Sequence, residues 1–255
     1  MRIALNAAGE VGRRAARILL AERDLDALGL YGHRRGTEDR RTMAITELTG
    51  FSVLVTDEPA PADALGFARI AADDGLSCVL AASPEVDEDL AAAFRDAGTT
   101  LLVGADLASG IAETLAAHEA ARIEGETGVT VAWTVPGSPR RRGEAIPFPD
   151  PIGARWGTEV SRRVVDTIPV RRFEVPVDGP WGAAMAKVQT GRRRARVVGV
   201  ADLSDHLAAI ALAAGTLVIT GNGLPPGLWR PADAAAAFLG AALRVGMDVA
   251  AFTAR

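Results

Sequence analysis

The first 125 residues alternate between short apolar runs and amphipathic segments of helical length, and this alternation restricts the fold more than any other feature. Apolar runs of strand length lie at 2–7, 25–34, 51–57, 76–83 and 99–106. Segments with apolar residues at helical spacing lie at 9–24, 61–75, 84–98 and 109–125. Near-continuous apolar strands that alternate with helices are typical of a parallel sheet covered on both faces. We therefore predict an α/β fold with a doubly wound parallel sheet over residues 1–125.

The pattern changes after Gly125. Strand-like runs follow at 128–137, 171–177 and twice within 183–202, around the turn "TGRRR". Residues 138–157 are rich in Pro, Gly and Arg and indicate a long loop, whereas 203–220 and 232–246 indicate helices. Strands separated by short turns and followed by a helix predict an α+β domain with antiparallel strands over residues 126–220.

The stretch "LNAAGEVGRR", residues 5–14, lies between the first apolar run and the first helical segment. It matches the dinucleotide-binding pattern G-x-G-x-x-G at the second and third glycines, Gly9 and Gly12, with Ala7 at the first. Backbone amides at the start of such a helix bind phosphate. The residues predicted to form this cofactor-binding turn are Ala7, Ala8, Gly9, Glu10, Val11 and Gly12. A turn without a ligand is the alternative, because Ala7 carries a methyl group where the pattern has glycine.

The second apolar run ends in Gly-His-Arg-Arg. A dinucleotide-binding fold places an acidic residue there, about 20 residues beyond the glycines, to bind the ribose 2′-hydroxyl of NAD. None of these four residues is acidic. Because guanidinium groups pair well with a 2′-phosphate, His33, Arg34 and Arg35 favour NADP, with NAD as the second choice. A solvated loop is the alternative for this segment.

Ligands of open parallel sheets bind outside the carboxyl ends of the strands. This rule places two further groups beside the cofactor, one after the fourth predicted strand and one after the fifth. They are Ala82, Ser83 and Pro84 in the first group, and Gly104 and Ala105 in the second. Asp106, the next residue, is predicted to bind the substrate.

Four motifs resemble one group of enzymes: "RIALNAAGEVGRRAARILL" at the start, "GHRR" after the second run, "LAASPE" after the fourth and "GADLASGIAETLA" after the fifth. Over residues 1–125 the chain resembles the saccharopine dehydrogenase-like and dihydrodipicolinate reductase-like NAD(P)-dependent oxidoreductases. The resemblance implies an N-terminal Rossmann domain, a smaller α+β domain, and a C-terminal helix within 221–255 that returns to the Rossmann domain. Dihydrodipicolinate reductases carry a His-His pair that this chain lacks, so that specific activity is not predicted.

A dehydrogenase needs a group that donates or accepts a proton as the hydride moves, and histidine or lysine usually serves. Lys187, the only lysine, lies in an apolar predicted strand and is the first candidate; an ordinary edge-strand lysine is the alternative. His206, at the start of the helix predicted over 203–220, is the second. Arg155 and Trp156 are predicted to bind the substrate, Arg155 through a carboxylate.

The composition excludes several kinds of partner and site. A formal net charge of −4 provides no basic field for nucleic acid or for an anionic membrane. The single cysteine, Cys78, is expected in the core, and the isolated histidines offer no metal cluster. No apolar run reaches the roughly 20 residues of a membrane span and no signal peptide is evident, so we expect a cytoplasmic protein.

These observations predict an NADP-dependent oxidoreductase that transfers a hydride between NADPH and a C=N or C=O group of a small, carboxylated metabolite. Two alternatives stay open: a non-catalytic NAD(P)-binding sensor or partner subunit, and an enzyme that holds the nucleotide for a non-redox reaction. An antiparallel sheet with an exposed apolar face often pairs with a copy of itself, so a homo-oligomer, most simply a dimer, is expected.

Overall fold

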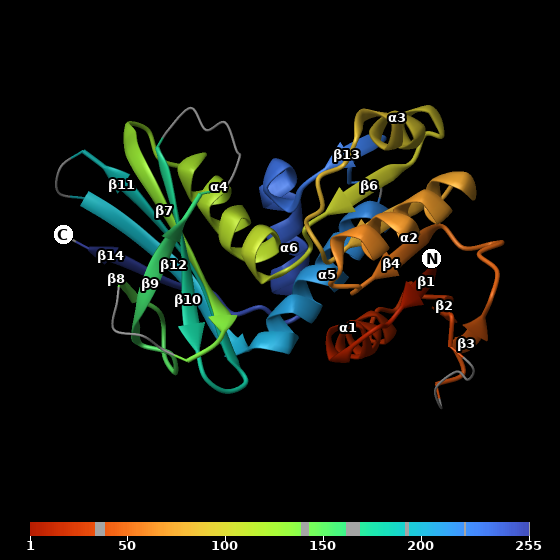
Figure 1. Cartoon of the computed structure of the whole chain (residues 1–255), viewed down its shortest axis with the longest axis horizontal. Coiled ribbons are helices and arrows are strands. Elements are labelled where there is room, and N and C mark those ends of the chain that lie inside the picture. Colours follow the sequence, from red (N-terminus) through yellow and green to blue (C-terminus); the bar gives the residue numbers. More distant parts are fainter. Residues whose placement is uncertain (34–38, 139–142, 162–168, 192–193, 222, 255) are drawn as a thin grey trace.

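The computed structural model consists of two seven-stranded sheets, A and B, with helices between and around them (Figure 1). The structure describes residues 1–33, 39–138, 143–161, 169–191, 194–221 and 223–254. Sheet A contains the N-terminal strands and lies on the right of the view, and sheet B lies on the left. The predicted fold class, a doubly wound parallel sheet followed by a part with antiparallel strands, is confirmed.

Sheet A has the strand order β13-β6-β5-β4-β1-β2-β3, and all its paired strands are parallel. Its strands are β1 (Arg2–Asn6), β2 (Ala27–Tyr31), β3 (Thr42–Ile45), β4 (Val53–Thr56), β5 (Ser77–Leu80), β6 (Thr100–Val103) and β13 (Gly227–Trp229). Successive side chains enter two different apolar layers: Ile3 and Leu5 of β1 face one, and Ala4 faces the other. All three are fully buried, which explains why the central strands are continuous apolar runs in the sequence.

Helices cover both layers of sheet A. The α-helices are α1 (Glu10–Leu20), α2 (Pro61–Asp73), α3 (Glu88–Asp96), α4 (Thr114–Ala120), α5 (Ser204–Thr220) and α6 (Ala235–Arg244). α1 and α5 pack on the layer of Ile3, and α2 and α3 pack on the layer of Ala4. α5 approaches the sheet closely because Gly215 has no side chain; a Cβ there would lie 2.7 Å from Leu102 Cδ2. A helix from beyond residue 200 thus closes one face of the N-terminal sheet.

Sheet B has the order β14-β12-β11-β7-β10-β9-β8. Its strands are β7 (Glu126–Pro136), β8 (Glu144–Pro147), β9 (Ala154–Val160), β10 (Val170–Val177), β11 (Trp181–Thr190), β12 (Arg194–Leu203) and β14 (Ala250–Ala254). β7 and β10 are parallel, and the other paired strands are antiparallel. The inner face, which contains Trp133 and Ala186, packs on α4 and on a π-helix, η1 (Leu107–Glu113). The outer face, which contains Phe173 and Met185, forms a separate apolar cluster.

The prediction of a long loop over 138–157 is wrong in part. Residues 144–147 and 154–160 form β8 and β9, an antiparallel pair at one edge of sheet B. The Pro and Gly residues of this segment predicted a loop, but strands at the edge of a sheet tolerate both residues. Between the two strands, Phe148 and Ile152 are buried in the cluster of the outer face. These two side chains cover part of the apolar outer face of sheet B. The dimer was expected because an exposed apolar face often pairs with a copy of itself, and it stays a prediction.

The remaining differences between the predicted and the observed elements lie at sheet edges and helix ends. β3, β13 and β14 were not predicted; each is a short strand at the edge of its sheet, where a strand needs little apolar periodicity. The helix predicted over 109–125 is η1 followed by α4. In the C-terminal segment, β13 joins sheet A beside β6, α6 packs on α4 and α5, and β14 pairs with β12 of sheet B.

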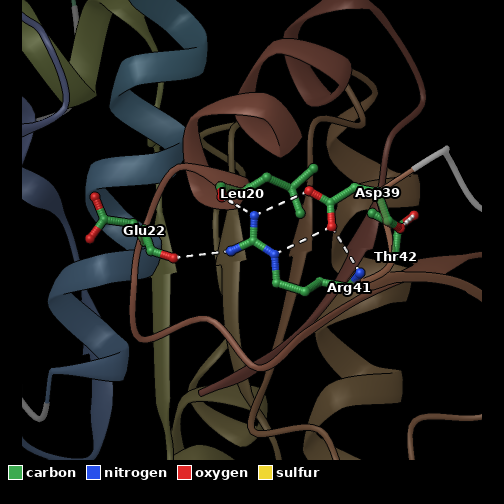
Figure 2. A network of polar contacts seen from close by, with 5 residues as sticks. All are labelled: Leu20, Glu22, Asp39, Arg41 and Thr42. Carbon is green, nitrogen blue, oxygen red and sulfur yellow. Dashed lines mark hydrogen bonds and ion pairs between the residues drawn. The ribbon is translucent and has the colours of Figure 1, made fainter.

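Arg41 anchors the start of β3 (Figure 2). Its guanidinium donates hydrogen bonds to the carbonyl oxygens of Leu20 and Glu22, at the end of α1, and to the Asp39 carboxylate. Asp39 also accepts from the Arg41 amide at 2.8 Å, and these hydrogen bonds from Arg41 lower the pKa of the Asp39 carboxyl. Since α1 begins at the carboxyl end of β1, this network lies at the opposite edge of sheet A from the glycine turn.

Candidate dinucleotide site

Three of the predicted groups lie at one edge of sheet A. Residues 7–12 follow β1, residues 82–84 follow β5, and residues 104–106 follow β6. The strands are parallel, so their carboxyl ends share one edge, and this edge faces sheet B (Figure 1). The chain order reverses between β1 and β4, which are neighbours in the sheet. Ligands of open parallel sheets bind at such a point of reversal, so the candidate site lies between the two sheets.

The glycine turn connects β1 to α1. Gly9 is the N-cap of α1, with extended backbone angles (φ −137°, ψ −162°) that any residue can adopt. Gly12 lies in the first turn of the helix, and a Cβ there would lie 2.7 Å from Ala7 Cα. Gly12 therefore has the role of the third glycine of the pattern, which lets the helix pack closely on the strand. Ala7 is buried beneath this contact.

A carboxylate that the sequence analysis did not single out lies against the turn. The amide of Ala8 donates to Asp57 Oδ1 at 2.5 Å. The amides of Gly9 and Gly12 donate to Asp57 Oδ2 at 2.9 and 2.7 Å. Asp57 directly follows β4 and caps α1 from this neighbouring strand, in place of the side chain that Gly9 lacks. The sequence feature that could have indicated Asp57 is its position as an acidic residue at the end of the apolar run over 51–57.

Two more amides lie at the N-terminus of α1. The first residues of a helix have no intrahelical acceptor for their amides, and Glu10 and Val11 lie between the residues that donate to Asp57. Their amides and the positive end of the helix dipole can receive a phosphate. The Glu10 side chain pairs with Arg13 and Arg14 at 3.0 and 3.1 Å. The hydrogen bond from Arg13 lowers the pKa of the Glu10 carboxyl.

The ends of β5 and β6 meet through two hydroxyl groups. The Ser83 hydroxyl donates to Ser109 Oγ at 3.1 Å. Gly104, with φ +81°, leaves room for this contact, since a Cβ there would lie 2.4 Å from Ser83 Oγ. Asp106 accepts from the amides of Ser109 and Gly110 at 2.7 and 3.3 Å, so its carboxylate caps η1. π-Helices are frequent at functional sites, so Ser109 is a candidate site residue that the sequence motifs did not indicate.

The structure describes one of the three residues predicted to bind the 2′-phosphate. His33 is exposed, and its amide donates to the Leu30 carbonyl at 3.4 Å. Arg34 and Arg35 lie outside the described residues. The choice of NADP over NAD therefore stays a prediction.

Lys187 lies in β11, opposite Thr130 of β7 and Val197 of β12. Its neighbours Ala186 and Val188 belong to the inner face of sheet B, so Lys187 lies on the outer face, where it is half-buried. The structure does not bring it to the edge of sheet A that carries the glycine turn.

His206 lies in the first turn of α5, which begins beside β12 and runs toward sheet A (Figure 1). Its Nε2 lies 3.9 Å from Asp202 Oδ2, which is too long for a hydrogen bond. One-third of its side-chain surface (33%) is exposed, so the imidazole is accessible at the N-terminal end of α5.

Arg155 and Trp156 are neighbours in β9, opposite Ile146 and Ala145 of β8. Neighbouring side chains of a strand point to opposite faces. Ile146 belongs to the outer cluster, which places Arg155 on the outer face and Trp156 on the inner face. The two residues therefore do not line one pocket together.

Within the described part of the chain, no three His, Cys, Asp or Glu side chains are arranged to hold a metal ion. Among the same residues, no helix combines the length and the apolar character that crossing a membrane requires. Cys78 is fully buried in β5, as expected for a core residue, and its burial raises the pKa of the thiol.

The fold has many solved relatives. Apo histidine-tagged saccharopine dehydrogenase (L-Glu forming) from Saccharomyces cerevisiae matches with a TM-score of 0.68 and 8% identity over 100% of both chains. Amine dehydrogenase from Mycobacterium smegmatis matches with a TM-score of 0.61 and 12% identity, over 90% of this chain and 94% of that one. Dipicolinate-bound dihydrodipicolinate reductase from Paenisporosarcina sp. TG-14 matches with a TM-score of 0.50 and 9% identity, over 90% of this chain and 97% of that one.

No protein-family model matches the chain, and no curated protein matches its sequence. At 8–12% identity, the likeness to the solved structures shows a shared fold. It extends over both sheets, whereas the resemblance in sequence covered the first 125 residues. The predicted resemblance to saccharopine dehydrogenase and dihydrodipicolinate reductase is thus confirmed at the level of the fold.

Proposed function

We propose that the protein is an NADP-dependent oxidoreductase that transfers a hydride between NADPH and a C=N or C=O group of a small, carboxylated metabolite. The glycine turn carries this proposal. It lies where the chain order of sheet A reverses, Gly12 is packed too closely for a side chain, and the amides of Glu10 and Val11 lie at a helix N-terminus. The three solved relatives are named as two dehydrogenases and a reductase, which supports an oxidoreductase.

The residues at the site suit a dinucleotide. The amides of Glu10 and Val11 would hold the diphosphate, residues 82–84 and 104–105 would flank the nicotinamide ribose, and His33–Arg35 would hold the 2′-phosphate. The bound nicotinamide supplies or accepts the hydride.

His206 is the proposed proton donor. Its accessible imidazole lies at the start of the helix that joins sheet B to sheet A, whereas Lys187 lies on the outer face of sheet B. Trp156, which lies on the inner face and has 42% of its surface exposed, is proposed to contact the substrate, with Asp106 as a further candidate. Arg155 lies on the outer face of sheet B, as Lys187 does, and is not assigned to the substrate. The name of amine dehydrogenase supports a C=N substrate.

Titration of the protein with NADPH and with NADH, followed by nicotinamide fluorescence, tests the cofactor. We expect both to bind and NADPH to bind at least about tenfold more tightly, the value of one good charge-assisted hydrogen bond. A preference for NADH would contradict the role of Arg34 and Arg35. No binding of either dinucleotide would refute the proposed function.

The position of Lys187 favours a second candidate, a dinucleotide-binding protein without catalysis, because one of the two predicted proton donors does not reach the site. Oxidation of NADPH in the presence of 2-oxo acids, with and without ammonia, separates the two candidates. If the protein turns over and His206→Gln lowers turnover without changing the affinity for NADPH, the result supports an enzyme with His206 as its proton donor. Tight NADPH binding without turnover across imines and carbonyl compounds supports the second candidate.

A further inference from the structure

The Asp57 carboxylate is buried against the glycine turn, with 8% of the residue surface exposed. It accepts three backbone hydrogen bonds: from Ala8 at 2.5 Å to one oxygen, and from Gly9 and Gly12 at 2.9 and 2.7 Å to the other. A charged acceptor strengthens such hydrogen bonds and makes them short. Nothing in the proposed hydride transfer uses this side chain.

The glycines of the pattern make room for this carboxylate. A Cβ on Gly12 would lie 2.9 Å from Asp57 Cγ, and a Cβ on Gly9 would lie 3.3 Å from Asp57 Oδ2. In this chain, therefore, the absence of side chains at positions 9 and 12 serves an internal anion as well as the approach of a nucleotide.

The hydrogen bonds divide the amides of the turn into two sets. Asp57 holds the amides of Ala8, Gly9 and Gly12, which orients the backbone between them. The amides of Glu10 and Val11 lie within that span, at the first two positions of α1. A turn held in one conformation before binding loses less conformational entropy when a ligand binds.

We propose that Asp57 is a positioning residue that fixes the glycine turn before the dinucleotide binds, so that the amides of Glu10 and Val11 receive its diphosphate. The inference rests on the proposed function, because it names the residue that prepares the same site. Asp57 acts through the backbone and does not itself touch the diphosphate.

Asp57→Asn tests this role, because an amide side chain has nearly the same size but offers one acceptor oxygen where the carboxylate offers two. The matched control is Asp63→Asn, which removes the same charge from an exposed residue of α2. Affinity is measured for NADPH and for adenosine 2′-monophosphate, which lacks the diphosphate; NADH and adenosine replace them if NADH is the tighter cofactor. Asp57→Asn should weaken NADPH binding by about tenfold or more and change binding of the monophosphate by less than about twofold.

The outcomes that overturn the inference are distinct. Unchanged NADPH affinity in Asp57→Asn would show that the turn does not depend on the carboxylate. Tighter NADPH binding would show that the carboxylate occupies the place of a phosphate. Equal losses for NADPH and for the monophosphate would show a general structural role. Absence of dinucleotide binding by the wild type would overturn the proposed function and the inference together, whereas the first three outcomes overturn the inference alone.

Hydrogen exchange of the wild-type protein, followed by NMR without any nucleotide, keeps the test decisive even if Asp57→Asn fails to fold. The amides of Ala8 and Gly9 should exchange slowly, because Asp57 already holds them. Exchange of these two amides at the rate of an unstructured chain would overturn the inference.

Discussion

Gly12 has no room for even one methyl group. A Cβ there would lie 2.7 Å from Ala7 Cα, and a backbone atom cannot move aside as the end of a flexible side chain can. Gly66 in α2 is the opposite case, since a Cβ there would have no atom within 4 Å. The two glycines thus separate the effect of close packing from the general effect of placing alanine in a helix.

Gly12→Ala should lower the free energy of unfolding by about 2 kcal/mol, because overpacking displaces the turn from β1. Gly66→Ala, the control, should leave this free energy unchanged or raise it by up to about 1 kcal/mol, since alanine favours helices more than glycine does. Urea unfolding measures both variants. Equal stability of the two would contradict the close contact of α1 with β1.

At the scale of elements, a buried ion pair connects η1 to sheet B. Arg172 Nε of β10 lies 3.2 Å from Glu113 Oε1 of η1, and the side chains are 8% and 15% exposed. η1 begins directly after its N-cap residue Asp106, close to the end of β6, so the pair connects the carboxyl edge of sheet A to the inner face of sheet B. The adjacent Arg171 instead pairs with Glu144 and Glu159 at the surface.

Arg172→Met should lower the free energy of unfolding by about 3 kcal/mol, because it leaves the Glu113 carboxylate buried without this partner. Arg171→Met removes an exposed guanidinium from the same strand and should have a smaller effect. The double variant Arg172→Met/Glu113→Gln should recover part of the loss, because neither charge of the pair remains. An Arg172→Met variant with wild-type urea midpoint would contradict the structural role of the pair.

At the scale of the whole molecule, one apolar cluster extends through both sheets. It includes Ile3 of β1, Trp133 of β7 and Ile210 of α5, all buried. α5 lies on sheet A although it belongs to the second half of the chain (Figure 1). The predicted division into 1–125, 126–220 and 221–255 stays a prediction, and a cut at residue 125 would divide this cluster.

A fragment of residues 1–125 should not fold into a native-like domain, because loss of α5 exposes the apolar layer of sheet A that contains Ile3. We expect it to bind the dye ANS and to lack a cooperative thermal transition, whereas the full chain should unfold in a single transition. Near-ultraviolet circular dichroism and calorimetry provide the measurements. A sharp transition and NADPH binding by the fragment would contradict this expectation and support the division at residue 125.

The part of the fold that the sequence predicts is the part that local patterns encode. Apolar runs and helical spacing identified β1, β2, β4, β5, β6 and the helices between them, because a strand buried on both faces must be apolar throughout. The glycine turn was predicted for the same reason, since it lies between a strand and a helix that are adjacent in the chain. Short edge strands such as β3 and β13 were not predicted. Each has a neighbouring strand on one side only, so it needs little apolar periodicity.

Local patterns in the sequence thus specify a doubly wound sheet with a candidate phosphate-binding turn at its carboxyl edge. Tertiary structure alone decided that Asp57, 45 positions beyond Gly12, holds that turn, that α5 closes the sheet, and that Lys187 faces away from the site. The physical reason is the range of the interactions. Periodicity acts between residues that are close in the chain, whereas a hydrogen-bond partner or the choice of a sheet face depends on which distant elements become neighbours.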